Sequence, residues 1–369
     1  EIDRCVNDPG FTQQYLSERL ANAGLLPMFG FPTRVRLLYT KLPRIAMPWP
    51  PEHGTVDREL DIAIAQFAPG SETVKDKRVY RSEGVVRLLP EGNHVKAKPG
   101  FTPPLGEENR LIGICGKCQA ICEVEDAASR RNECPACGEH EMSYYDARVP
   151  WGFYCEDRPR EFDGNFEWMP HASRPMLFMD SEPREHLAGS NIALLTSAKE
   201  VVSLNTNGDE GGFVFREKRN RDIDGVFYTT LDDDWDGEER TIALLSRKKT
   251  DVLVVDLQTL ASTIAISPRT VYGRAAWYSF AFLLRTAASA LLDIDVKELQ
   301  AGIRTVSVDG VPRGQVFLCD SLENGAGYCR WLADHEVFSH LLSTACDLES
   351  DSIVVKWMRP DHREHCDTS

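Results

Sequence analysis

The sequence predicts a mixed α/β fold of the α+β type, in which strands outnumber helices. Three observations lead to this prediction: many short apolar runs are bounded by turn residues, one long apolar segment carries helix-capping residues, and two Cys-x-x-Cys pairs lie close together. The composition, with 42% hydrophobic and 27% charged residues, is that of an ordinary globular protein. A length of 369 residues suggests two or three domains.

The N-terminal part is predicted to be rich in strands. A helix is expected over residues 11–23, where apolar residues recur with helical spacing before Gly24. Residues 24–39 are apolar but interrupted by Pro and Gly, so we expect a segment that crosses between two packed bodies and enters a strand near its end. Loose alternation predicts a short strand over 60–67. A strand pair is expected over 79–89, and the four prolines of 90–106 indicate a linker.

Two cysteine pairs carry the clearest chemical signal. Cys115 and Cys118 form one Cys-x-x-Cys pair, and Cys134 and Cys137 form another after fifteen intervening residues. Each pair turns tightly enough to aim two thiolates at one point, and this spacing is typical of zinc. Four thiolates complete a tetrahedral shell, so we expect a structural Zn ion in a ribbon, not a catalytic one. The alternatives are disulfides, which an oxidising compartment would favour, and chance pairing among 11 cysteines.

Further elements follow along the chain. The ribbon is expected to contain short strands at 110–114 and 141–145, whereas 151–184 gives no regular pattern. Later strands are predicted at 191–202, 211–216, 225–228, 241–245, 251–257 and 316–320, and the apolar run 252–255 indicates a strand buried on both faces.

The clearest helix is predicted over residues 271–292. Ser267 is expected to be its N-cap, and Pro268 its first helical residue. Arginines interrupt this apolar segment, which favours a central buried helix over a membrane span. A second, short helix is predicted at 295–301.

These patterns divide the chain into three expected parts. A β-rich segment covers 1–104, the zinc ribbon covers 105–148, and an α/β domain with the central helix covers 149–369. The sequence starts at Glu1 without Met, so we expect a piece of a longer polypeptide. The absence of a signal peptide, the absence of a continuous apolar span and the scattered cysteines together predict a cytoplasmic location without membrane contact.

The charge distribution bears on nucleic-acid contact. A net charge of −15 argues against a protein that coats nucleic acid. Two local basic tracks are nevertheless candidate contacts for DNA phosphates, with solvated loops as the alternative. Their residues are Arg34, Arg36, Lys41 and Arg44 in the first, and Arg216, Lys218 and Arg219 in the second.

Two further candidate sites lie near the C-terminal end. A strand, a glycine-rich turn and a helix from about Tyr328 would leave free amides that attract phosphate, so Gly325 and Gly327 are candidate DNA contacts. The alternative is a tight turn without a ligand, because no Lys-Ser/Thr follows the glycines. Cys346 and Cys366 could contribute to a second metal site, although a zinc site needs about four ligands.

Several stretches together resemble a family of bacterial superfamily-two helicases. They are the segment 24–34, the paired cysteine knuckles, the strand and glycine turn of 317–328, and the His365-Cys366-Asp367 end. Members of the family include MrfA-type DNA-repair helicases and the DrmB subunits of the DISARM anti-phage system, which the chain resembles more. The resemblance implies a helicase-associated, zinc-binding C-terminal domain that engages DNA. It also implies a helicase motor domain or a DrmA-like subunit as partner.

One departure from that family limits the expected activity. Neither a Gly-x-x-x-x-Gly-Lys-Ser/Thr motif nor an Asp-Glu-x-His/Asp box occurs, so no catalytic residue is assigned and ATP hydrolysis in the family's manner is excluded for these residues. We expect a non-catalytic accessory module of a helicase or translocase assembly in anti-phage defence. The alternatives are the C-terminal domain of a single-chain DNA-repair helicase, a scaffold without DNA contact, and an Mg²⁺-dependent hydrolase that uses Asp256, Asp309 or Asp320.

Overall fold

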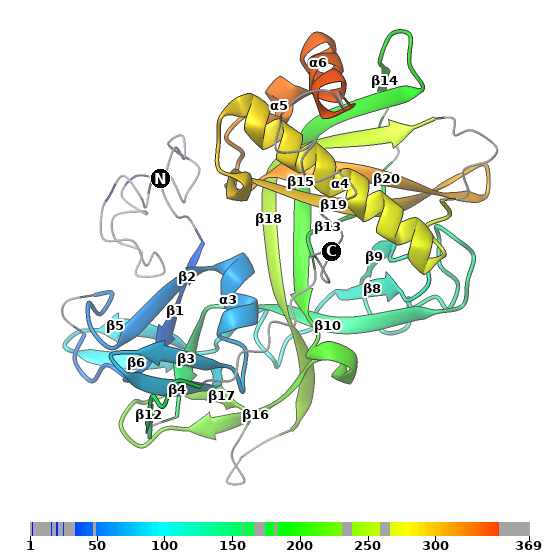
Figure 1. Cartoon of the computed structure of the whole chain (residues 1–369). Coiled ribbons are helices and arrows are strands. Elements are labelled where there is room, and N and C mark those ends of the chain that lie inside the picture. The colour runs from blue at the N-terminus through cyan, green and yellow to red at the C-terminus, as the bar shows by residue number, and fades with distance from the viewer. Residues whose placement is uncertain are drawn as a thin grey trace.

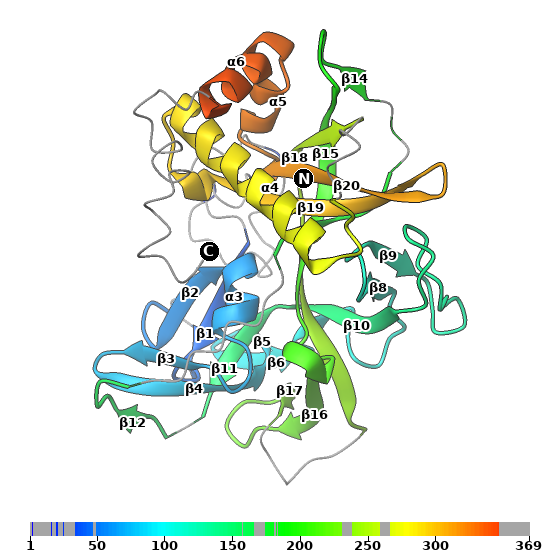
Figure 2. The same ribbon diagram turned by 45° about the vertical axis from the view of Figure 1, so that its right-hand side comes forward.

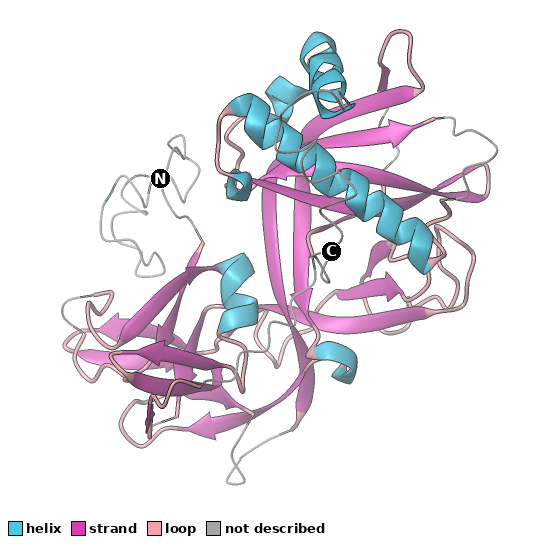
Figure 3. Cartoon of the chain, viewed as in Figure 1, coloured by secondary structure: helices cyan, strands magenta, loops and turns pink. Residues whose placement is uncertain are grey.

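The computed structural model describes residues 34–346 except 47–48, 157, 166–173, 181, 183, 231–237 and 259–265, together with the single residues 2, 16, 20 and 25. It confirms the predicted mixed α/β class, with many strands and few helices (Figures 1 and 3). The helix predicted at 11–23 and most of the predicted crossing segment lie outside the described residues.

The elements follow one another in chain order. The strands are β1 Val35–Tyr39, β2 Thr55–Glu59, β3 Glu72–Lys75, β4 Arg78–Val85, β5 Arg87–Glu91, β6 His94–Lys98, β7 Phe101–Thr102, β8 Leu111–Cys115, β9 Ile121–Val124, β10 Met142–Pro150, β11 Gly152–Cys155, β12 Arg160–Glu161, β13 Met176–Leu177, β14 Glu185–His186, β15 Ile192–Asn205, β16 Phe213–Arg219, β17 Val226–Thr229, β18 Arg240–Leu257, β19 Leu299–Val308 and β20 Val311–Asp320. The helices are α3 Leu60–Gln66, α4 Val271–Leu292, α5 Tyr328–Leu332 and α6 His335–Cys346, and the short 3₁₀ turns are η1 Gly208–Glu210 and η2 Val296–Glu298.

One group of strands, which we call the N-proximal body, surrounds β1. Strand β1 pairs antiparallel with β2 and parallel with β11, while β11 continues through β4 to β17. Aromatic rings fill the core between them, with Phe67 against Phe153 and Phe101 against Phe215 at centroid distances of 5.9 and 5.0 Å. Segments far apart in the sequence therefore share one core.

Helix α3 occupies residues for which the sequence predicts a strand, so that prediction is wrong. The side chains of Leu60, Ala63, Ile64 and Phe67 are all buried in the N-proximal core. Their spacing of three and four residues is helical, and it outweighs the short alternation of Leu60, Ile62 and Ile64 because Ile62 is exposed.

Two long strands join the N-proximal body to the rest of the molecule. Strands β15 and β18 pair antiparallel without interruption from Ile192 opposite Leu257 to Asn205 opposite Leu244 (Figure 1). The sequence predicts β18 as two strands, 241–245 and 251–257, but the structure has a single one. The polar residues between those stretches stay within the strand because they find partners, as Lys248 does at 3.2 Å from Asp61 of α3. The predicted burial of 252–255 on both faces is confirmed, since all four side chains are fully buried.

The second group of elements, the helix-bearing body, contains β13–β15, the end of β18, β19, β20 and α4–α6. Strand β20 pairs antiparallel with both β18 and β19, and α4 crosses the face of this sheet (Figure 2). The bounds of α4 agree with the prediction, but its N-cap is Thr270, whose hydroxyl accepts a hydrogen bond from the Gly273 amide at 3.0 Å. The predicted cap at Ser267 and the predicted first helical residue, Pro268, are both wrong, because these residues belong to the preceding turn.

Burial of α4 is one-sided. Gly273, Trp277, Ala281, Leu284 and Ala288 form a buried stripe against the sheet, whereas Tyr272 is 88% exposed. The helix is therefore half covered and not central in the sense that the sequence predicts. By length and composition α4 is the one helix among the described residues that could cross a membrane, and a third of its most apolar window is buried inside the protein.

Three other stretches differ from the prediction. The predicted linker 90–106 contains β6 and β7, because Gly92 with φ of 63° allows a tight β5–β6 hairpin next to Pro90. Residues 151–184 contain β11, β12 and β13, which pair with strands distant in sequence. The predicted helix 295–301 is the short turn η2 followed by β19. The expected division into 1–104, 105–148 and 149–369 stays a prediction, while strands from all three parts pair with one another.

Candidate metal centre

The two cysteine pairs lie in turns of the same design. In the first, the Gln119 amide donates to the Cys115 carbonyl at 2.9 Å, and in the second the Gly138 amide donates to the Cys134 carbonyl at 2.9 Å. The residue after each pair has a positive φ, 60° at Gln119 and 73° at Gly138. Each turn is then closed by the amide of its first cysteine, which donates to the carbonyl five residues later. Both turns thus point two thiols the same way.

The four thiol groups converge on a single point. The Sγ atoms of Cys115, Cys118, Cys134 and Cys137 all lie within 4.8 Å of one another. The Cys115–Cys137 and Cys118–Cys134 Sγ distances are both 3.7 Å, far longer than a disulfide bond of about 2.05 Å. For a tetrahedral zinc with Zn–S bonds of about 2.3 Å, the sulfur atoms would be about 3.75 Å apart. The residues therefore fit a Zn(Cys)₄ site, and among the described residues no other such ligand cluster is found.

Burial opposes the ionisation of these thiols. Burial raises the pKa of Cys118, and it raises the pKa of Cys137 to about 12. For Cys115 burial acts in the same direction, but the backbone amides of Cys118 and Lys117 donate to its sulfur and bring its pKa below the usual value. A divalent cation at the centre would stabilise all four thiolates, so metal binding would release protons.

The ribbon is built by three strands and docks on the helix-bearing body. Strand β8 pairs with β9 and with β10, which confirms the predicted strands at 110–114 and 141–145. The first knuckle meets the other body through Thr305, whose hydroxyl donates to the Cys118 carbonyl at 2.7 Å, and through Arg274, whose guanidinium donates to the Lys117 carbonyl. The second knuckle is held by the Arg269–Glu139 ion pair. The first knuckle thus contacts α4 and β19, and the second contacts the turn that precedes α4.

Most of the predicted DNA-contacting cations have partners within the protein. Each of four lies within 4 Å of a carboxylate: Arg34 of Glu323, Arg44 of Asp222, Arg216 of Glu239 and Lys218 of Glu83. Arg36 donates to the Pro150 carbonyl at 2.7 Å, and its guanidinium lies 5.4 Å from the Trp151 ring centre. Lys41 and Arg219 are exposed. The structure therefore does not gather the seven residues into one free basic surface.

The glycine-rich turn after β20 already has an internal anion. The amides of Ala326, Gly327 and Tyr328 donate to Oδ2 of Asp320 at 2.7, 2.8 and 3.2 Å, and the Cys329 amide donates to Oδ1 at 3.0 Å. The expectation of free amides at this turn is therefore wrong, and the prediction that Gly325 and Gly327 contact DNA loses its geometric reason. The sequence itself indicates this internal anion, because Asp320 stands directly at the end of the strand, before the glycine-rich turn.

The carboxylates considered for a hydrolase do not form a site. Asp320 caps α5, Asp256 is buried beside Arg184 at 3.7 Å, and Asp309 lies in the turn between β19 and β20. Within the described ranges no acidic group takes part in a metal-ligand cluster. Of the possible second metal site, Cys366 and the side chain of Cys346 lie outside the described residues.

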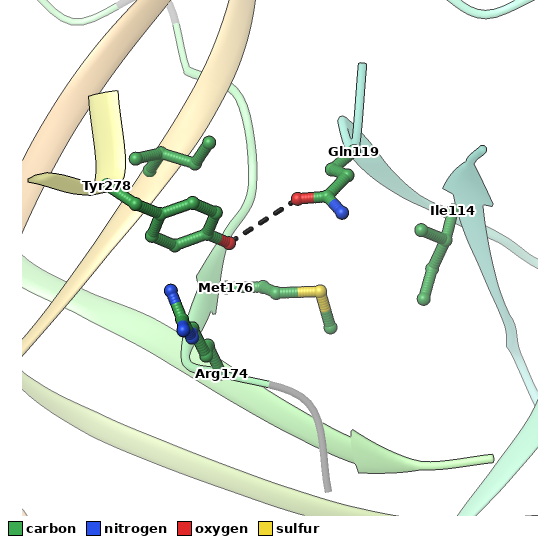
Figure 4. Close-up of a pocket in the computed structure, with 6 residues that line it drawn as sticks. Ile114, Gln119, Arg174, Met176 and Tyr278 are labelled. Carbon is green, nitrogen blue, oxygen red and sulfur yellow. Dashed lines mark hydrogen bonds between the residues drawn. The ribbon is translucent and has the colours of Figure 1, made fainter. Parts of the chain in front are cut away.

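A cavity beside the first knuckle was not anticipated from the sequence. Its walls come from the ribbon, from β13 and β19, and from α4, so no local motif could reveal it. Figure 4 shows Tyr278 of α4 facing Gln119 of the knuckle, with Met176 and Arg174 beside them. The Tyr278 hydroxyl and the Gln119 Oε1 atom are 3.4 Å apart.

Comparison with known proteins gives one curated relative of limited similarity. No family model matches the chain. The Druantia protein DruE of Escherichia coli (strain UMEA 4076-1) is 22% identical over 393 residues, which cover 96% of this chain and 21% of that protein. The chain thus spans about a fifth of the length of this relative.

Two solved structures overlap with part of the chain. The DUF1998 helicase MrfA bound to DNA has a TM-score of 0.31 and 12% identity, over 72% of this chain and 34% of that chain. The same helicase bound to DNA and AMPPNP has a TM-score of 0.25 and 12% identity, over 73% and 33%. At these TM-scores the likeness does not carry over to function. The chain is thus distantly similar to a Druantia protein and to a DUF1998 helicase region, and it carries a candidate four-cysteine zinc site.

Proposed function

We infer that this chain is a non-catalytic, zinc-binding module that engages DNA within a helicase or translocase assembly of anti-phage defence. The observation that carries the proposal is the closed set of four thiols, three buried and one half-buried, which leaves no coordination position for water or substrate. A metal of this kind orders a segment rather than performing chemistry. The ion would be held by Cys115, Cys118, Cys134 and Cys137, and it would fix the two knuckle turns.

The accessory role is supported by the absence of ATPase motifs from the given sequence. The sequence has no nucleotide-binding P-loop and no helicase acidic box. In the described parts of the chain, buried carboxylates such as Asp320 and Asp256 are engaged by backbone amides or arginines. An ATP-driven motor would therefore be supplied by another part of a longer protein or by a separate subunit.

The choice of assembly rests on similarity. The similarity to a Druantia protein and the sequence resemblance to DISARM subunits of the DrmB type both favour a defence complex. Its proposed location, the cytoplasm, rests on the sequence alone. A DrmA-like subunit or a helicase domain of the same polypeptide is the proposed partner. The C-terminal domain of a single-chain DNA-repair helicase is the alternative within the same family.

DNA binding by the purified chain is the test. Fluorescence anisotropy with labelled DNA should give an affinity that falls steeply as salt rises from about 50 to about 200 mM, because phosphate contacts release counterions. The variants Lys41→Glu and Arg219→Glu should weaken binding and reduce the salt dependence, whereas the exposed Lys77→Glu, outside both basic tracks, serves as control. Affinity that does not change with salt would contradict the proposal.

A scaffold without DNA contact is the second candidate. The observation that favours it is the internal pairing of Arg34, Arg44, Arg216 and Lys218 with carboxylates. If this candidate is correct, none of the charge reversals will alter DNA binding, and pull-down with the motor subunit will depend on the zinc ribbon.

A further inference from the structure

The cavity between the ribbon and α4 has the size and the walls of a ligand site. Its volume is about 360 Å³, which lies in the lower part of the range for small-ligand pockets. The lining is mostly apolar, with a few polar groups that converge on the same space. The lining residues are Ile114, Gln119, Arg174, Met176, Tyr278 and Ile303.

An aromatic and cationic stack begins at the cavity wall, with Tyr278 and Arg174, and continues along α4. The rings of Tyr278 and Phe282, one helical turn apart on α4, are stacked with centroids 6.3 Å apart. The Arg174 guanidinium lies over both rings, 4.5 Å from the first and 4.9 Å from the second. Arg285 approaches Phe282 from the next turn at 5.0 Å. Planar guanidinium groups and aromatic rings are the surfaces on which bases of single-stranded nucleic acid stack.

Many other cations in the described part of the chain lie beside a carboxylate, which these two arginines do not. Arg34, Arg216 and Lys248 each have a carboxylate within 4 Å. Across the described residues, no carboxylate pairs with Arg174 or Arg285, and the buried Nε of Arg285 has no hydrogen-bond partner. In a chain of net charge −15, such arginines form a local positive site that suits an anion.

Two polar side chains, Gln119 and Tyr278, present hydrogen-bonding groups to the cavity. Gln119 provides a carbonyl oxygen and an amide nitrogen, and its oxygen faces the Tyr278 hydroxyl at 3.4 Å. Burial raises the pKa of Tyr278, so the hydroxyl remains a neutral donor under physiological conditions. Gln119 is fixed in place because it belongs to the first knuckle, with its φ of 60°.

The geometry points to this cavity as a binding site for one base of single-stranded DNA, with the flanking phosphates held by Arg174 and Arg285. Gln119 and Tyr278 contact the base edge, and Ile114, Met176 and Ile303 enclose the base. This assignment rests on the proposed engagement of DNA and specifies the strand form and the contact surface. It also couples the site to the metal, because the knuckle that would be ordered by zinc forms one wall.

The test uses the whole chain with bound zinc and an oligonucleotide of about 12 nucleotides that contains 2-aminopurine, whose fluorescence reports on stacking. Binding should change the fluorescence, and the single strand should bind more tightly than a duplex of the same sequence. Gln119→Ala should weaken single-strand binding about tenfold without altering its salt dependence. Arg174→Gln should weaken binding and lower the slope of log K against log salt by about 1.

Arg81→Gln is the matched control, because Arg81 is half exposed on β4 of the N-proximal body. Circular dichroism and zinc content confirm that each variant folds. DNA binding that persists unchanged in Gln119→Ala and Arg174→Gln would overturn the assignment of this cavity while leaving the proposed function intact. If the unaltered chain does not bind DNA at all, both the assignment of this cavity and the proposed function are overturned. A cavity that takes dAMP as tightly as the oligonucleotide would overturn the assignment to a strand.

Discussion

Replacement of one knuckle cysteine, Cys134→Ser, should abolish stoichiometric zinc binding. The two Sγ–Sγ distances of 3.7 Å correspond, in a regular tetrahedron, to a metal–sulfur distance of about 2.3 Å, which is the Zn–S bond length found in proteins. Removal of one of four thiolates leaves an incomplete shell. Because structural zinc contributes on the order of 10 kcal/mol to folding of its segment, we expect the ribbon of Cys134→Ser to lose its order.

Elemental analysis and zinc K-edge absorption spectroscopy measure this prediction directly. The unaltered chain should contain one zinc per molecule with four sulfur neighbours at about 2.3 Å. Cys122→Ser is the control, because Cys122 is a half-buried cysteine of the same ribbon that is not part of the cluster. Hydrogen exchange should show that the beginning of α4 becomes less protected when zinc is removed. Chains without zinc, sulfur pairs at about 2.05 Å, or zinc loss in Cys122→Ser would refute the reasoning.

Three further predictions concern stability. Asp320→Asn should lower the free energy of unfolding in urea by about 3 kcal/mol, because at least one buried backbone amide loses its acceptor and faces an NH₂ group. Asp334→Asn, at the exposed start of α6, is the control and should change this free energy little. Equal effects of the two substitutions would contradict the prediction. Burial raises the pKa of Asp61, but the charge of Lys248 and hydrogen bonds from Ser246 and Gln300 outweigh burial and hold this pKa low. The ionised Asp61 therefore stabilises the fold above about pH 4, and this stabilisation is lost at lower pH. Asp61→Asn should flatten the fall in the free energy of unfolding on acidification, and an unchanged pH profile would argue against this role. Gly314→Ala should cost about 1–3 kcal/mol because the new Cβ would lie 2.4 Å from the Trp277 ring, and a Tm equal to that of the unaltered chain would show that the ring can move.

The candidate metal centre was predictable from the sequence because its geometry is local. The spacing of Cys115, Cys118, Cys134 and Cys137 indicates both the ligand set and the surrounding strands, and each turn closes through its own backbone. The cavity beside it was not predictable, since it combines Gln119 of the ribbon with Tyr278 of α4. For the basic tracks, the structure does not gather the predicted residues into one free surface. Charges that are adjacent in sequence find distant carboxylates, as Lys218 does with Glu83, and this pairing appears only in the folded chain.

Secondary structure follows the same division. The bounds of α4 were predictable because its largely apolar segment is long, whereas its N-cap, Thr270, was not. Helix α3 was missed because two turns of helix offer too few residues to distinguish its spacing from alternation. Strand β18 was divided in two because the polar residues around Lys248 look like a turn, whereas their partners come from α3 and other strands.

The uninterrupted ladder of β15 and β18 determines how the molecule can respond to mechanical load. A pulling force along these strands acts in shear on fourteen aligned residue pairs at once, so the hydrogen bonds resist together instead of opening one by one. If the chain acts beside a translocating motor, as proposed, this ladder would transmit tension between the two bodies with little extension. Its compliance would lie in the twist of the ladder, not in a hinge.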